Sequence, residues 1–263
     1  DAASFKEANG AWPKANEAYE TIVDNLKKKA YGYITSKADN PLEREEGLTI
    51  RKYVQGELDK DNGYQNFLSS TTPGGIVNFK VILQNTGNTQ VSNIRLADLL
   101  PQPGDNSNDE ERESKWKPIP QSYDVFKVSK NGQKTQLSPA IYTAKGAFKQ
   151  SLRGDSAAFG DSWTKGGSFS ENATAVGFNF GDVTLQEGEY ISLELKMKAP
   201  TSGDYAGTFA SNNASVYYDS VTHTNNLVVS NTVHTIYHVK PVGMGGKVFL
   251  DEDIDGLYAE KEK

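Results

Sequence analysis

The sequence predicts an all-β protein, an antiparallel sandwich that one amphipathic helix precedes. From Gly47 onward, short segments alternate apolar and polar residues, as strands with one buried and one exposed face do. Turn residues separate these segments, and the Asn131-Gly132 pair is typical of a tight hairpin. Many short alternating strands joined by turns favour two packed antiparallel sheets.

The N-terminal segment, residues 1–46, differs from the rest of the chain. In the stretch WPKANEAYETIVDNLKKKAYGYI, apolar residues recur at helical spacing, and Pro13 suits the first turn of a helix. The spaced positions are Ala15, Tyr19, Ile22, Val23, Leu26 and Ala30. This stretch predicts one amphipathic helix, and the polar residues from Asn40 to Glu46 predict a connection into the first strand.

The strands are predicted within residues 47–240. The segments with strand composition are 48–54, 76–85, 91–100, 123–129, 133–138, 175–181, 190–199, 207–218 and 227–239. Long insertions at 101–120 and 151–172 interrupt them and predict surface loops, where binding functions tend to lie. Trp116 and Trp163 lie in these insertions, where exposed aromatic side chains often mark a contact with carbohydrate or protein. The alternative, which we favour, is that they anchor the loops to the sandwich.

The composition excludes several classes of function. A formal net charge of -6 gives no basic surface for nucleic acid. The chain has no cysteine, which rules out disulfides, a thiol nucleophile and a cysteine-based zinc site. No apolar run reaches the length of a membrane span, so we expect no membrane insertion. No phosphate-binding loop, Ser/His/Asp order or nucleophile elbow is present, and we expect the protein not to be an enzyme.

A lysine lies on the apolar face of the first predicted strand, within GLTIRKYVQG. Because side chains alternate along a strand, Leu48, Ile50, Lys52 and Val54 point toward the core. A buried ammonium group is costly unless it is paired, neutralised or consumed by a reaction. Lys52 is therefore a candidate for chemistry inside the fold.

Two other polar residues also lie on the apolar face of a predicted strand. They are Asp98 in NIRLADLLP and Asn231 in LVVSNTVHTIYHV. If the three side chains meet, burial favours the neutral, nucleophilic amine of Lys52, and a desolvated carboxyl group can stay protonated. The amine then attacks the Asn231 carboxamide, Asp98 moves protons and stabilises the oxyanion, and an amide bond remains after ammonia leaves. The alternatives are a buried ion pair of Lys52 with Asp98, or a strand register displaced by one residue.

Two long stretches resemble a known repeat. VNFKVILQNTGNTQVSNIRLADLLP resembles the immunoglobulin-like repeat of bacterial surface proteins, in which one strand ends in Asn-Thr-Gly-Asn and the next carries an Asp before Leu-Pro. FGDVTLQEGEYISLELKMKAPTSGDYAGTFASNNASVYY resembles the later half of that repeat, with its Gly-Glu turn and Asn-x-Ala-x-Val strand. The resemblance covers Gly47 to Val239 and implies an immunoglobulin-like sandwich.

Domains of this kind occur in Gram-positive adhesins and pilins, including the collagen-adhesin type. They often carry a self-formed Lys-Asn isopeptide bond that an acidic residue assists. The resemblance implies Lys52 and Asn231 as the cross-linked pair and Asp98 as the acid, with Asn213 on the preceding strand as a competing acceptor. It also implies an extracellular location on the bacterial cell surface, with cell-wall attachment through parts outside this chain.

The tail, residues 241–263, contains an acidic loop. DEDIDGLYAEKE fits the spacing of a calcium loop with oxygen ligands from Asp251, Asp253, Asp255, Glu262 and the carbonyl of Leu257. The strand-like KVFL precedes it, so the tail resembles the start of a B-type repeat of serine-aspartate adhesins rather than an EF-hand. The other interpretation is an acidic solvated tail. Apart from this calcium, we expect no cofactor.

These observations predict a surface adhesin domain that binds a host protein or glycan. The alternative is a mechanical stalk or pilus-backbone module without its own ligand, and a third interpretation is the accessory domain of a carbohydrate-active enzyme. The long insertions favour the adhesin, because a pure spacer does not need elaborated loops.

Overall fold

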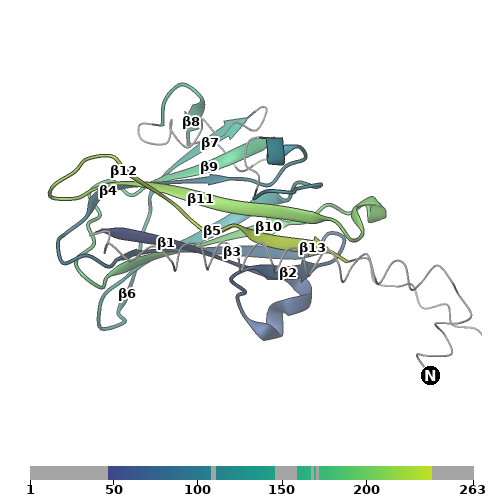
Figure 1. The fold of residues 1–263 in the computed structure, drawn as a ribbon, viewed down its shortest axis with the longest axis horizontal. Helices are drawn as coiled ribbons and strands as arrows, with labels where there is room; N and C mark the ends of the chain where they lie inside the picture. The colour runs from purple at the N-terminus through teal and green to yellow at the C-terminus, as the bar shows by residue number, and fades with distance from the viewer. Residues whose placement is uncertain (1–46, 108–110, 146–158, 167–168, 170–171, 239–263) are drawn as a thin grey trace, which may run out of the picture.

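The described part of the protein consists of two β-sheets packed face to face, which confirms the predicted all-β class (Figure 1). The computed structural model describes residues 47–107, 111–145, 159–166, 169 and 172–238. The predicted N-terminal helix and the acidic tail lie outside these ranges. The sandwich therefore corresponds to the segment for which the sequence predicts strands.

The smaller sheet has five strands in the order β1-β3-β10-β5-β6, and each neighbouring pair in it is antiparallel. The bounds are β1 Leu48–Gly56, β3 Ile76–Asn85, β5 Ile119–Val128, β6 Lys134–Gln136 and β10 Tyr190–Lys198. The hairpin from β5 to β6 turns at Asn131-Gly132, as predicted. Gly132 has a φ of 84°, a left-handed conformation that glycine adopts without strain.

The larger sheet follows the order β2-β13-β11-β4-β9-β7-β8, and β12 pairs with β11 beside β13. The bounds are β2 Leu68–Thr71, β4 Ser92–Leu99, β7 Ala140–Lys145, β8 Trp163–Lys165, β9 Ala173–Asn179, β11 Phe209–Asp219, β12 Asn226–Val229 and β13 Val233–Tyr237. The short 3₁₀ helices η1 (Glu57–Asn62), η2 (Asp105–Ser107) and η3 (Gly203–Tyr205) lie in connections. The pair β2 and β13 is parallel, and β2 follows β1 of the smaller sheet along the chain.

The strand prediction missed β2, β7 and β8, and it joined β12 to β13. The missed strands β2 and β8 have the sequences LSST and WTK, which are too short and too polar to show an apolar alternation. Val228 and Val233 both contact the core, although residues an odd number of positions apart in one continuous strand point to opposite faces. The alternation therefore changes phase between β12 and β13. Leu227 and Val229, which would share the face of Asn231 in one continuous strand, are therefore exposed.

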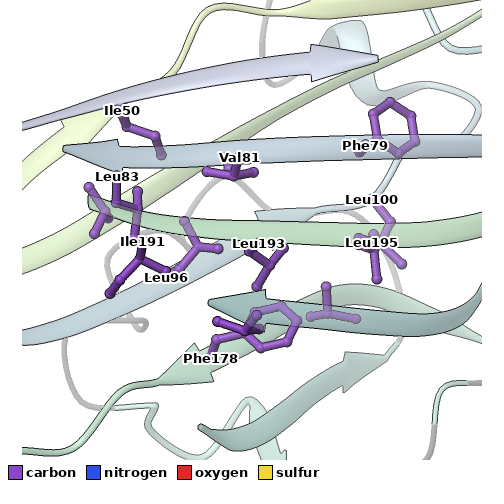
Figure 2. Packing of buried hydrophobic residues seen from close by; sticks show 14 of the residues in the cluster. Ile50, Phe79, Val81, Leu83, Leu96, Leu100, Phe178, Ile191, Leu193 and Leu195 are labelled. Atoms are coloured by element: carbon purple, nitrogen blue, oxygen red, sulfur yellow. The ribbon is translucent and has the colours of Figure 1, made fainter. Parts of the chain in front are cut away.

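The hydrophobic core lies between the two sheets (Figure 2). Side chains of the smaller sheet meet those of the larger sheet in one cluster, which includes Ile50, Phe79, Val81, Leu83, Ile191, Leu193 and Leu195 from the former and Leu96, Leu100 and Phe178 from the latter. Full burial of one such side chain stabilises the fold by roughly 1.5–3 kcal/mol. A charged residue in this layer must therefore be compensated within the layer.

Aromatic side chains fix both long insertions to the larger sheet. Trp116 is 1% exposed and meets Tyr237 edge-on, with 5.5 Å between ring centroids. Trp163 is 7% exposed and packs with Phe159 over the outer face of the sheet at Gly177, where a Cβ atom would overlap the Phe159 ring. The predicted anchoring role of both tryptophans is confirmed.

Asn85 ends β3 in the Asn-Thr-Gly-Asn stretch and holds the turn that follows. It is fully buried, and its Nδ2 donates to Thr89 O at 2.7 Å and to Leu185 O at 2.8 Å. Its Oδ1 accepts a hydrogen bond from Gly87 N at 3.0 Å. One carboxamide thus joins the turn after β3 to the segment before β10.

Replacing Asn85 by Ala leaves these backbone groups without their partner. The free energy of unfolding should fall by roughly 2–4 kcal/mol, because buried polar groups lose their hydrogen bonds. Asn78→Ala, on the outer face of the same strand, is the matched control and should stay within about 0.5 kcal/mol of the parent. Denaturant unfolding measures both, and equal effects would contradict the role given to Asn85.

Candidate functional site

Lys52 lies fully buried between the two sheets, as the alternation in β1 predicts. Its neighbours on the same face, Ile50 and Val54, belong to the hydrophobic core. The Nζ atom lies 5.2 Å from the centre of the Phe79 ring. Since these surroundings replace water with hydrocarbon, they disfavour the charged form of the lysine.

Asp98 of β4 meets Lys52 across the space between the sheets. Asp98 is fully buried, and its Oδ2 accepts a hydrogen bond from the Lys52 Nζ. Burial lowers the pKa of Lys52 below its ordinary value, the Asp98 carboxylate acts in the opposite direction, and the positive charge of Arg112 acts in the same direction as burial. Lys52 is therefore closer to the nucleophilic amine than an exposed lysine is.

The Asn231 carboxamide lies against the main chain of β1. Its Oδ1 accepts from Lys52 N at 2.9 Å, and its Nδ2 donates to Lys52 O and to Asn66 O, both at 3.0 Å. Asn231 falls in the break between β12 and β13, where the alternation changes phase, and for this reason it leaves the face on which the sequence places it. It contacts Lys52, but the contact is with the backbone of the lysine.

Asn213 is on the face of β11 that points away from Lys52. Its Oδ1 accepts from Arg112 Nη1 at 2.9 Å, and its Nδ2 donates to Thr232 Oγ1 at 3.1 Å. Its neighbour Ala214 belongs to the core between the sheets, and successive residues of a strand point to opposite faces. The backbone of the larger sheet thus separates the Asn213 carboxamide from the Lys52 amine.

Asn212 carries the carboxamide that enters the core from β11. It is fully buried and shares its face with Ala210 and Ala214, which are core residues. Ala214 is directly opposite Asp98 in the ladder between β11 and β4. Asn212 is therefore a diagonal neighbour of Asp98, and diagonal neighbours lie about 7–8 Å apart, within reach of longer side chains.

The polar atoms of this cluster are incompletely paired. Among the residues that the structure describes, neither Oδ1 nor Nδ2 of Asn212 has a hydrogen-bond partner, and Asp98 Oδ1 has none either. A buried polar atom without a partner costs roughly 1–3 kcal/mol, and such atoms are rare enough to need an explanation. Here they are the atoms that a reaction between the lysine amine and the asparagine carboxamide would use.

The sequence prediction did not consider Asn212, although the sequence contained a signal that its side chain faces the core. The Asn-x-Ala-x-Val pattern begins at Asn212 and continues through Ala214 and Val216, which share one face. Asn213 is displaced from this pattern by one residue, which moves its side chain to the other face of the sheet. The pattern therefore selects Asn212 from the two adjacent asparagines.

The other predicted site falls outside the described residues. The expected calcium ligands Asp251, Asp253, Asp255, Leu257 and Glu262 all lie there, so calcium binding stays a prediction. Within the described ranges, no group of three or more His, Asp or Glu side chains could hold a metal ion. No helix in those same ranges is long and apolar enough to cross a membrane.

No protein-family model matches the chain, and none of the curated proteins matches it. A solved structure that is similar is a variant of BcpA, the major pilin subunit of Bacillus cereus, with 11% identity and a TM-score of 0.43 over 72% of this chain and 40% of that chain.

Two further similar structures come from surface proteins. The C-terminal domain of AspA, an antigen I/II-family protein of Streptococcus pyogenes, has 14% identity and a TM-score of 0.40, over 72% of this chain and 46% of that chain. ACE19, the collagen binding subdomain of the Enterococcus faecalis surface protein ACE, has 12% identity and a TM-score of 0.37, over 70% of this chain and 95% of that chain. The chain spans less than half the length of the BcpA and AspA structures.

The titration of the Lys52 amine can be measured in an Asn212→Ala variant, which lacks the carboxamide on the core face of β11. Because burial lowers the pKa of Lys52 in the folded state, the unfolded chain binds more protons than the folded chain up to the ordinary lysine pKa of 10.5. The free energy of unfolding should therefore rise as pH increases across the interval between the two pKa values. Denaturant unfolding at a series of pH values measures this slope. The double variant Asn212→Ala with Lys52→Met is the control, and an identical slope in it would contradict the lowered pKa.

Proposed function

We propose that the described sandwich is a module of an extracellular bacterial surface protein of the adhesin or pilin kind, and that an isopeptide bond joins Lys52 to Asn212 in it. The observation that carries the proposal is the buried carboxamide of Asn212, unpartnered within the described chain and on the face that looks toward the Lys52–Asp98 pair. The resemblance of the sequence to cross-linked surface repeats supports it. Asn212 takes the place of Asn231 as the proposed acceptor.

Asp98 carries the protons in the proposed reaction. It accepts a proton from the Lys52 ammonium, which leaves a neutral amine. The Nζ then attacks Cγ of Asn212, and the protonated Asp98 carboxyl group donates a hydrogen bond to the oxyanion that forms at Oδ1. Asp98 next relays a proton from Nζ to Nδ2, the Cγ–Nδ2 bond breaks, and ammonia leaves. The product is an amide between Nζ and Cγ, no other reactant is consumed, and the reaction occurs once per chain.

The apolar surroundings serve this chemistry in two ways. The core around Lys52 and the ring of Phe79 exclude water, which would stabilise the ammonium form. They also hold the reacting groups in one arrangement, which replaces a slow encounter with a reaction between fixed neighbours. Folding itself is therefore the step that starts the reaction.

The bond would tie β1 of the smaller sheet to β11 of the larger sheet. The chain between Lys52 and Asn212 then becomes a closed loop, and the two sheets cannot separate completely. By the chain-entropy relation for a cross-link across a loop of this size, the tie stabilises the fold by roughly 5 kcal/mol. In a chain without cysteine, the isopeptide bond takes the part that disulfides play in other extracellular proteins.

Binding of a host protein or glycan is the role that we propose for the module, with a mechanical stalk as the second candidate. One observation favours the stalk, because Trp116 and Trp163 fix the described parts of both insertions to the sheet. A glycan array and a panel of immobilised host matrix proteins distinguish the two roles. Specific binding supports the adhesin, and a cross-linked module that binds nothing supports the stalk.

Intact-mass measurement of the folded protein tests the cross-link. The parent chain should be lighter than its sequence mass by one ammonia, because the reaction releases Nδ2 of Asn212. Lys52→Met and Asn212→Ala should each restore the full mass, and Asp98→Ala should leave most of the chains unreacted.

The matched controls are the two other asparagines. Asn213→Ala and Asn231→Ala should both still lose ammonia once the reaction is complete. A parent chain with its full sequence mass would reject the isopeptide bond. Loss of ammonia that persists in Asn212→Ala and disappears in Asn231→Ala would return the acceptor role to Asn231.

A further inference from the structure

A buried arginine lies on the other side of the larger sheet from the Lys52 site. Arg112 of the first insertion is fully buried, and its nitrogen atoms donate in three directions. Nε donates to Asp105 Oδ2 at 2.9 Å, Nη1 to Asn213 Oδ1 at 2.9 Å, and Nη2 to Leu100 O at 3.0 Å. Burying an ion pair such as Arg112 with Asp105 seldom adds net stability, so its place in the fold needs another explanation.

The partners of Arg112 are next to the reacting residues along the chain. Leu100 follows Asp98 by two positions, and Asn213 directly follows Asn212. The backbone ladder between β4 and β11 extends only as far as Asn213. Arg112 therefore bonds both strands at the point where their ladder stops, immediately beside the residues that must hold the acid and the carboxamide in register.

The segment that carries Arg112 is itself attached to β11. Lys115 N donates to Phe209 O at 2.8 Å, and Ser211 N donates to Ser114 Oγ at 2.9 Å. Glu113 N donates to Ser211 Oγ at 3.1 Å. These hydrogen bonds pair the segment with the part of β11 that extends beyond the end of β4. The backbone on either side of Arg112 is therefore fixed to β11, in addition to the hydrogen bonds that the guanidinium group itself makes.

We propose that Arg112 is a positioning residue for the cross-linking reaction, because it clamps the end of β4 to β11 and so holds Asp98 and the Asn212 carboxamide in place for Lys52. This inference rests on the proposed function above. It gives the first insertion a task inside the fold, whereas the sequence predicts a surface loop there. Displacement of a reacting group by about 1 Å can slow such a reaction on the order of a hundredfold, which is the kind of error that the clamp prevents.

Arg112 also acts on the reaction through its charge. The charged groups that act on Lys52 are Asp98 from β4 and Arg112 from the insertion. The positive charge of Arg112 lowers the pKa of Lys52, since one cation disfavours another nearby. Without this charge, a smaller fraction of Lys52 is the neutral amine at a given pH, and the reaction needs a higher pH to reach the same rate.

The experiment measures the rate of ammonia loss in the full chain. The chain is recovered unfolded from inclusion bodies, diluted into folding buffers of several pH values, and quenched with acid at intervals for intact-mass analysis. Arg112→Lys keeps the charge but lacks the planar guanidinium group that donates to three partners. The rate of ammonia loss should therefore fall by about tenfold or more, while the midpoint of the rate–pH curve stays unchanged. Arg112→Gln with Asp105→Asn removes both charges, and its midpoint should also move to higher pH, which a purely structural defect would not produce.

Arg95→Lys is the matched control. Arg95 lies on β4 itself, and its Nη2 donates to Asn225 Oδ1 at 2.8 Å, away from the reacting groups. This control should react at the parent rate. Arg112 variants that fold, as judged by circular dichroism, and react at the parent rate with the parent midpoint would overturn the inference.

The same measurements distinguish failure of the proposed function from failure of this inference, and they remain decisive if the Arg112 variants do not fold. If the parent chain itself never loses ammonia, the proposed function and this inference both fall, whereas a reactive parent with unaffected Arg112 variants rejects only the inference. If the Arg112 variants do not fold, Asn213→Ala decides the matter, since it removes one arm of the clamp and keeps the Arg112–Asp105 pair. Slower ammonia loss that still reaches completion supports the clamp, and an unchanged rate overturns it.

Discussion

The contact between Lys52 and Asp98 is the constraint on which the arrangement of the sandwich depends. Two ionisable groups without water cost several kcal/mol each unless they meet, so β1 of one sheet and β4 of the other must be aligned at this point. The apolar residues on either side of Lys52 then determine how the facing strands pack. A purely apolar core would tolerate many alignments of the two sheets, whereas a core that contains this ion pair tolerates few.

The longer strands were predictable from the sequence, and so were two of the site residues on them. Lys52 and Asp98 lie on β1 and β4, where polar residues interrupt a clear apolar alternation. Asn231 was placed wrongly by alternation because a break between two short strands reverses its phase. Asn212 was not among the predicted residues. Both faces of β11 are buried, so its sequence lacks the alternation of apolar and polar residues that would indicate which face each side chain takes. The Asn-x-Ala-x-Val pattern alone distinguished it from Asn213.

The insertions explain why β11 has no exposed face. Residues 111–116 cover one end of the larger sheet, and Phe159 with Trp163 covers another part of its outer surface. A segment that is polar and long in sequence therefore became a layer of the fold, because its few large or charged side chains bond the sheet at specific points. Sequence length between strands predicts a connection, but it does not reveal whether the connection lies on the surface or packs down onto a sheet.

The side chain of Asn231 has a consequence for how copies of this protein meet. Among the described strands, β1 is the outermost of the smaller sheet, and an outermost strand offers free N–H and C=O groups that can recruit a strand from another molecule. Asn231 occupies these groups at Lys52, and Gln65 occupies them at Val54 through backbone hydrogen bonds of 2.7 and 2.8 Å. A single carboxamide thus imitates a short piece of neighbouring strand. Where many copies are crowded together, this edge resists sheet-to-sheet aggregation, and association between molecules is directed to side-chain surfaces.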